Sequence, residues 1–178
     1  MDARRESDVA PMKNRATVER KSERELVVTR TVNGPARTVF EAWTKPELLK
    51  QWWVPKSFGL SLLSCEADVR VGGSYRLVFS FEGSEMAFFG TYREVTPHSR
   101  LAWTNDEGGD AGQVTTVTFE ERAGKTLVVV RELYPSKEAL DAALADGSSA
   151  WGTPGQDVTL ETFEQLDELV VALAAGGR

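Results

Sequence analysis

A short tryptophan-rich segment restricts what this chain can fold into. Residues 35–55, PARTVFEAWTKPELLKQWWVP, hold three of the five tryptophans and carry apolar residues at helical spacing in two runs. Pro35 suits the first position of one helix, and Pro55 ends a second, because the residue before a proline avoids helical dihedral angles. We expect Thr44 to cap the second helix, with Glu47 bonding back to it. Helices this short are unstable alone in water, so they must pack on a large apolar surface.

The remaining pattern predicts that this surface is an antiparallel sheet. Residues 25–32, ELVVTRTV, are rich in β-branched side chains and predict the first strand. After the two short helices, the hydrophobic period changes to that of a strand. Further strands are expected over residues 60–69, 74–81, 85–95, 100–105, 114–121 and 125–133. The turns between them are short, which favours a meander of neighbouring strands.

The C-terminal part predicts one short and one long helix. The short helix covers residues 136–145, and the long one runs from about residue 153 to about residue 174. The long helix has an apolar stripe made of Phe163, Leu166, Leu169, Val170 and Leu173. The expected fold class is therefore α+β, with a curved sheet of six to seven antiparallel strands wrapped around the long C-terminal helix.

The charged N-terminal part is expected to lie outside this domain. Residues 1–23 mix both signs of charge and lack a sustained apolar period. We interpret them as a flexible tail, with an arm that docks a partner as the alternative. Residues 24–175 form the single expected domain.

Composition excludes several functional classes. The net charge of −6 in 178 residues argues against a nucleic-acid partner. No apolar run approaches the roughly 20 residues of a membrane span, so no membrane insertion is expected. The single cysteine, Cys65, cannot form an internal disulfide, and the N-terminus lacks the apolar region of a signal peptide. These features predict a cytoplasmic protein, as a monomer or homodimer.

The supply of catalytic and metal-binding side chains is small. His98 is the only histidine and lies in a turn signal, Thr-Pro-His-Ser, so a solvated position is expected. A Ser-His-Asp or Cys-His arrangement would have to use it. A site with two histidines is excluded, and no zinc spacing or phosphate-binding glycine loop is present. We therefore expect no metal and no cofactor.

Several stretches of the chain resemble a known family. They are residues 35–55, DVRVGGSYRLVF (68–79), FFGTYREVTPHSRLAWT (88–104), the pair Ala150-Trp151, and TLETFEQLDELV (159–170). The order of elements resembles the helix-grip fold of the START-like, or polyketide-cyclase (SRPBCC), superfamily. The local sequences resemble its activator-of-heat-shock-ATPase homologues, over about residues 24–173. The chain departs from the family pattern at Val54, where members commonly have glycine, and in a Gly- and Pro-rich segment, residues 147–157.

The resemblance implies an apolar cavity between the curved sheet and the long helix, beneath the two short helices. The expected ligand-binding residues are Trp52, Trp53, Tyr75, Phe79, Phe88, Tyr92, Trp103, Arg131, Trp151 and Phe163. Two alternatives are open: the aromatic side chains form a solid core, and Arg131 lies on the surface instead of binding a carboxylate. The strand pattern does not settle which way Arg131 faces.

Three functional hypotheses follow, because the family implies no single activity. The first is a protein that binds an apolar or amphipathic, lipid-like small molecule. The second is a cyclase- or hydrolase-type enzyme that uses carboxylates or tyrosines of the cavity. The third is a protein-interaction module that regulates a chaperone ATPase. The first is favoured over an enzyme, since no catalytic arrangement is recognisable in the sequence.

Overall fold

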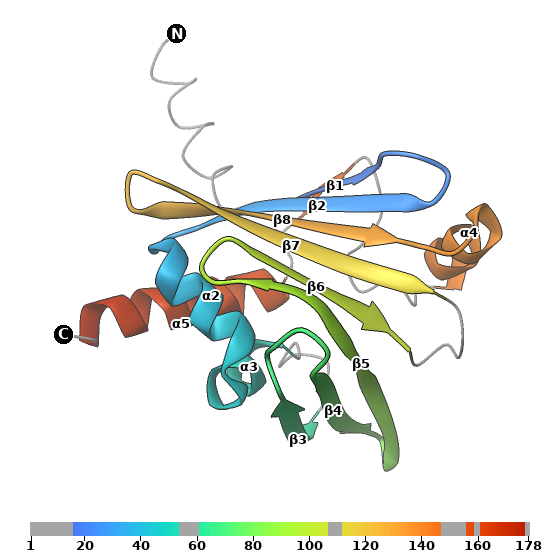
Figure 1. The fold of residues 1–178 in the computed structure, drawn as a ribbon, viewed down its shortest axis with the longest axis horizontal. Coiled ribbons are helices and arrows are strands. Elements are labelled where there is room, and N and C mark those ends of the chain that lie inside the picture. The colour runs from blue at the N-terminus through green and yellow to red at the C-terminus, as the bar shows by residue number, and fades with distance from the viewer. Residues whose placement is uncertain (1–15, 54–60, 107–111, 147–155, 159–160, 177–178) are drawn as a thin grey trace, which may run out of the picture.

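The computed structural model describes residues 16–53, 61–106, 112–146, 156–158 and 161–176 (Figure 1). The strands are β1 (Ala16–Arg20), β2 (Glu25–Val32), β3 (Ser61–Ala67), β4 (Ser74–Phe81), β5 (Ser84–Thr96), β6 (Arg100–Asn105), β7 (Gln113–Arg122), β8 (Lys125–Leu133) and β9 (Gln156–Val158). The helices are α2 (Ala36–Thr44), α3 (Pro46–Trp52), α4 (Lys137–Asp146) and α5 (Glu161–Gly176). No helix among these residues is long and apolar enough to cross a membrane.

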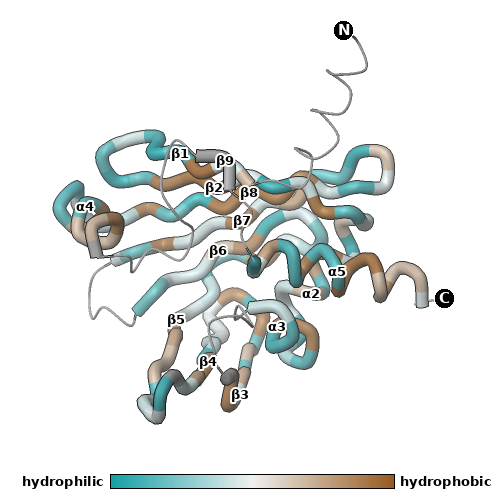
Figure 2. Tube along the Cα trace, turned by 180° about the vertical axis from the view of Figure 1, so that it is seen from behind, coloured by the Kyte–Doolittle hydropathy of each residue, from teal (hydrophilic) through white to brown (hydrophobic). Residues whose placement is uncertain are grey.

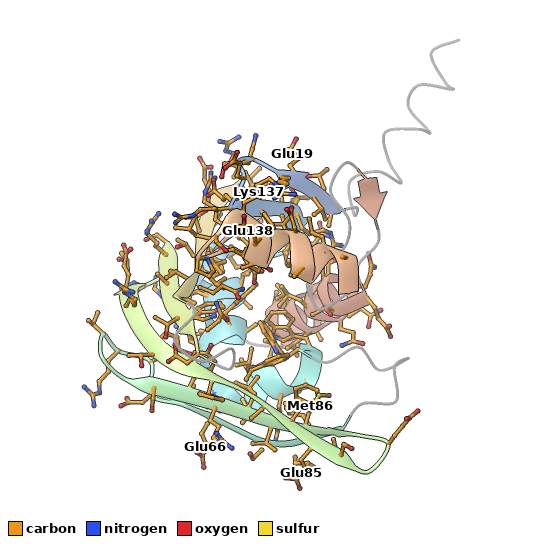
Figure 3. The ribbon with its side chains drawn as sticks, turned by 90° about the vertical axis from the view of Figure 1, so that its right-hand side faces the viewer. Glu19, Glu66, Glu85, Met86, Lys137 and Glu138 are labelled. Atoms are coloured by element: carbon orange, nitrogen blue, oxygen red, sulfur yellow. The ribbon has the colours of Figure 1, made fainter. Side chains whose placement is uncertain are left out.

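The described strands form one antiparallel sheet in the order β3-β4-β5-β6-β7-β8-β2-β1-β9. The run from β3 to β8 is the expected meander. The sheet curves around α2, α3 and α5, and we call the side facing these helices the inner face (Figure 3). The α+β helix-grip prediction is confirmed. Its strand number is corrected from six or seven to nine, because β1 and β9 extend the sheet beyond β2.

The apolar stripe of α5 grips the inner face as expected. Phe163, Leu166 and Val170 are fully buried. A Cβ atom at Gly34 would overlap the Val170 side chain, so a glycine lets the loop after β2 approach the helix. Hydrophobic residues concentrate in the C-terminal turns of α5, where Val171 is exposed (Figure 2).

The long helix begins later than the sequence suggests. It starts at Glu161, whereas Gln156 opens the short strand β9. Strand β9 pairs with β1, with Val158 opposite Ala16. The expected helix start at residues 153–155 lies outside the described residues. A three-residue strand carries too little periodicity to be recognised, and only its partner strand holds it in place.

Strand β1 lies within the segment expected to be a tail. Ala16 and Val18 are buried, and Val18 pairs with Val28 on β2. Along β1, buried Ala16 and Val18 alternate with exposed Thr17 and Glu19. This alternation is too short to be recognised as a strand in a sequence with so many charged neighbours. The described sheet therefore includes residues 16–20, which lie inside the 1–23 boundary drawn from the sequence.

The two short helices form as predicted, but their junction differs. The N-cap of α3 is Lys45, followed by Pro46, and no side chain caps this helix. The Thr44 hydroxyl instead donates to the Phe40 carbonyl oxygen at 2.9 Å. The predicted capping box of Thr44 with Glu47 is wrong, because Thr44 is the last residue of α2 and its hydroxyl bonds back into that helix.

Candidate functional site

Four tryptophans join the short helices to the inner face. The ring centre of Trp43 lies 4.8 Å from that of Trp52, 5.9 Å from Trp53 and 6.1 Å from Trp103 on β6. The Trp52 indole N–H donates to the Ala42 carbonyl oxygen at 2.9 Å, so this ring fixes the angle between the two helices. Trp52 and Trp43 are buried and Trp53 is half-buried.

A row of four side chains crosses the inner face beside this cluster. Tyr92 on β5 is opposite Trp103, Trp103 is opposite Thr115 on β7, and Thr115 is opposite Glu132 on β8. Residues opposite each other in neighbouring strands point to the same side of a sheet. All four are buried, and we call them the inner row. Neighbouring strands are about 4.8 Å apart, so the row spans roughly 14 Å.

One end of the inner row is aromatic. The ring centre of Tyr75, on β4, lies 5.7 Å from that of Tyr92 and 6.3 Å from that of Trp103. The Tyr75 hydroxyl reaches across β5 and donates to the Thr104 carbonyl oxygen at 2.8 Å. It crosses where β5 has Gly90, its register partner, and a Cβ atom there would overlap that same oxygen. Burial raises the pKa of the Tyr92 phenol, which therefore stays protonated at neutral pH.

The other end of the inner row is polar. The Thr115 hydroxyl donates to Glu132 Oε2 at 3.4 Å, and the Tyr134 hydroxyl donates to Glu132 Oε1 at 3.1 Å. Asn105 Nδ2 donates to Thr115 Oγ1 at 2.7 Å. Glu132 is only 8% exposed. Burying a carboxyl group costs free energy unless hydrogen bonds compensate, so this network makes the position tenable.

The polar end was missed as a site in the sequence, because the apolar run of residues 127–130 does not show which face of the strand is buried. Val128, Val130 and Glu132 alternate along β8 and all point inward. Arg131 must then point to the opposite, outer face. Its side chain is 49% exposed and lies 3.8 Å from the Glu25 carboxylate. The structure thus places the predicted ligand arginine away from the inner row, paired on the surface with an acidic side chain.

The other predicted site residues lie on either side of the inner row. Phe79 is buried against half-buried Phe88, with ring centres 5.0 Å apart, farther out along β4 and β5. Beyond them, Met86 on β5 is exposed on the inner face of the sheet, while Glu66 on β3 and Glu85 on β5 point away from the helices (Figure 3). Phe163 is buried on α5, and Trp151 lies outside the described residues.

A pocket of about 320 Å³ opens between α3 and the edge strand β3. It is lined by Pro46, Glu47, Lys50, Leu62, Leu63, Ser64 and Cys65. Burial raises the pKa of the Cys65 thiol to about 11, and the nearby Lys50 ammonium partly opposes this. The Cys65 thiol also contributes to the raised pKa of Tyr92, so the pocket lies near the aromatic end of the inner row.

A second buried polar group on the inner face belongs to the helix–sheet contact. Arg30 on β2 is 1% exposed and lies 3.4 Å from the Glu164 carboxylate and 3.9 Å from that of Asp167, both on α5. Burial lowers the pKa of Arg30, and the two carboxylates oppose the shift. Among the described residues, no group of three or more His, Cys, Asp or Glu side chains is placed to hold a metal.

Comparisons with known proteins agree with this geometry. The profile of one family, described as Activator of Hsp90 ATPase homolog 1-like protein, matches residues 33–170. No curated protein matches the chain significantly.

Solved structures from several bacteria share the fold. A protein from Nitrosomonas europaea is 24% identical, covers 88% of this chain and 99% of its own, and has a TM-score of 0.73. One from Rhodobacter sphaeroides is 23% identical, covers 89% and 99%, and scores 0.75. An AHSA1-like protein from Aeromonas hydrophila is 17% identical, covers 85% and 96%, and scores 0.60. At such identities these likenesses establish the fold alone.

Proposed function

The chain belongs to the family of Activator of Hsp90 ATPase homolog 1-like proteins, and from this premise we propose that it binds an amphipathic small molecule on the inner face of its sheet. Membership confirms the resemblance found in the sequence. It does not identify an activity, since function depends on the site and not on the fold.

The observation that supports the proposal is the composition of the inner row. Apolar side chains are sufficient to fill a core, whereas each buried polar group needs hydrogen bonds to compensate for the loss of water. Here Thr115 and Glu132 continue directly from Tyr92 and Trp103, in register across four strands. Ligand sites typically combine apolar and aromatic walls with a few placed polar groups, and the inner row has that combination.

Binding is tested with N-phenyl-1-naphthylamine, an uncharged apolar probe that fluoresces in apolar surroundings. We expect a saturable increase in probe fluorescence at one probe per chain, with energy transfer from the tryptophans. Trp103→Leu should weaken binding about tenfold, because a large part of the contact surface is removed. Arg131→Leu is the matched control on the outer face and should leave binding unchanged. Non-saturating fluorescence, or equal effects of the two substitutions, would contradict the proposal.

The two other hypotheses from the sequence have less support. A chaperone-binding module needs a docking surface, and the large exposed apolar residues of the described chain come from five separate segments: Leu63, Val71, Met86, Leu133 and Val171. An enzyme would use Glu132 or a tyrosine as an acid or base. Thr115 and Tyr134 donate hydrogen bonds to Glu132, which favours holding a ligand because the position of its carboxyl group is fixed.

A further inference from the structure

The pocket between α3 and β3 is a second candidate site, because none of its described lining residues belongs to the inner row. The helix and the strand lie side by side at this edge of the sheet (Figure 1). The volume of about 320 Å³ is at the lower end of the range for small-molecule pockets. At roughly 30 Å³ for each water molecule, the pocket has room for an organic molecule with the bulk of about ten waters.

One wall of the pocket is apolar because β3 is irregular. Its register with β4 shifts between Leu62 and Ser64, so Leu63 is an additional residue, as in a β-bulge. A bulge changes the direction of side chains, which lets successive residues of this strand line the same pocket. Leu63 is 52% exposed, so its apolar surface is accessible to a ligand. Pro46 adds apolar surface from α3.

The opposite wall carries a cation, Lys50 of α3. Within the described part of the chain Lys50 forms no ion pair, whereas Lys45, the N-cap of the same helix, lies 3.9 Å from the Glu41 carboxylate. The Lys50 ammonium lies near Cys65, since it opposes the rise in the thiol pKa that burial causes. Glu47 also lines the pocket but is not among the charges that act on this thiol. The Cys65 side of the pocket therefore favours a negative charge.

We propose that this pocket binds a small amphipathic anion, with its carboxylate against the Lys50 ammonium and its apolar chain against Leu62 and Leu63. The inference goes beyond the proposed function, because it concerns a separate site and does not depend on binding at the inner row. A cationic ligand would meet the Lys50 ammonium, and like charges repel at short range. Lys50 is exposed, so the ion pair should improve the affinity only about threefold over an uncharged ligand of equal length.

The test uses Cys65 as the reporter, because it is the only cysteine of the chain and lines the pocket. Octanoate, octanol or octyltrimethylammonium is added to the folded protein near pH 8, and alkylation by iodoacetamide is followed by mass spectrometry. We expect octanoate to slow alkylation saturably, at about threefold lower concentration than octanol, and octyltrimethylammonium to protect least. An additive that unfolded the protein would accelerate alkylation, so unfolding cannot imitate this protection.

Two lysine variants test the role of the charge, each compared with its own alkylation rate without additive. Lys50→Gln should remove the preference for octanoate over octanol. Lys125→Gln, the same change at an exposed position of β8, should keep it.

The possible outcomes separate the site from its ligand class. If octanoate gives no saturable protection of Cys65, the pocket is not a binding site and the inference is wrong. Equal protection by all three additives, or a preference for octanoate that persists in folded Lys50→Gln, would overturn the assignment of an anion. The ranking of the additives needs only the unmodified protein, so it decides the matter even if a variant does not fold.

Discussion

A single position, Glu132, shows how the chemistry of a residue depends on its neighbours across the sheet. Along β8 it is one acidic residue after an arginine, and nothing local distinguishes it from a solvated side chain. In the folded chain, Thr115 lies directly opposite and Tyr134 follows two residues later, and both donate to its oxygens. A surface-type residue thereby becomes a buried acceptor beside an aromatic wall.

The thiol of Cys65 gives a prediction at the same scale. Burial raises its pKa to about 11 from the ordinary value of 9.0, and thiolate is the reactive form. Because these two pKa values differ by about two, alkylation by iodoacetamide near pH 8 should be about 100-fold slower in the folded protein than in urea. The rate, followed by mass spectrometry, should keep rising towards pH 11. A plateau near pH 9 would show an ordinary, solvated thiol.

The same shift predicts how stability depends on pH. The folded protein holds the Cys65 proton more tightly than the unfolded chain, so this group stabilises the fold fully below about pH 9. That contribution is lost as the pH rises towards 11. Urea unfolding at several pH values should therefore show a loss of stability over this range that is smaller in Cys65→Ala. An identical pH profile for both proteins would contradict the assignment.

At the scale of elements, β1 shows that a short strand is held by its partners. It pairs with β2 on one side and β9 on the other, and its Arg20 lies 2.8 Å from Asp141 of α4. Its own sequence has little strand signal. The described sheet places it where Ala16 and Val18 complete the inner face.

Deleting residues 1–22 should therefore destabilise the protein, contrary to what a flexible tail would predict. Burial of Val18 and Ala16 is lost and the edge of β2 is uncovered, at a cost of about 2 kcal/mol or more. In a chain of this size the melting midpoint should fall by roughly 4–8 °C. Deleting residues 1–15 leaves β1 intact and should change the midpoint by no more than about 2 °C. Equal midpoints for the two truncations would show that β1 contributes nothing to stability.

At the scale of the whole molecule, one aromatic cluster links the two short helices to the sheet. Trp43 of α2 contacts Trp52 of α3, Trp103 of β6 and Phe119 of β7. On α5, Gln165 donates to the carbonyl oxygen of Trp52 at 3.0 Å. The helices and the sheet therefore share one core.

A shared core predicts that the protein unfolds in a single transition. Tryptophan fluorescence reports mainly on the contact of α2 and α3 with the sheet, while far-ultraviolet circular dichroism reports on the whole backbone. In urea the two signals should give the same midpoint, as expected for a cooperative domain. Loss of fluorescence at a clearly lower urea concentration would mean that the short helices detach before the sheet unfolds.

The sequence by itself determined the elements whose side-chain period is long enough to read. The hydrophobic pattern repeats over several residues in strands β4 and β6, in the two short helices and in the apolar stripe of α5. The local sequence was therefore sufficient to predict these elements. Family motifs supplied the order of the layers. The apolar run before Arg131 left the two faces of β8 undecided, and Arg131, not Glu132, was the residue expected to contact the ligand.

Tertiary structure alone decided the rest, because it depends on contacts between distant residues. Strands β1 and β9 exist only by pairing with each other and with β2. The inner row brings together side chains from four strands, and only the register of those strands places Tyr92, Trp103, Thr115 and Glu132 in one line. Register is fixed by burying one face of the whole sheet, a property that no single strand possesses.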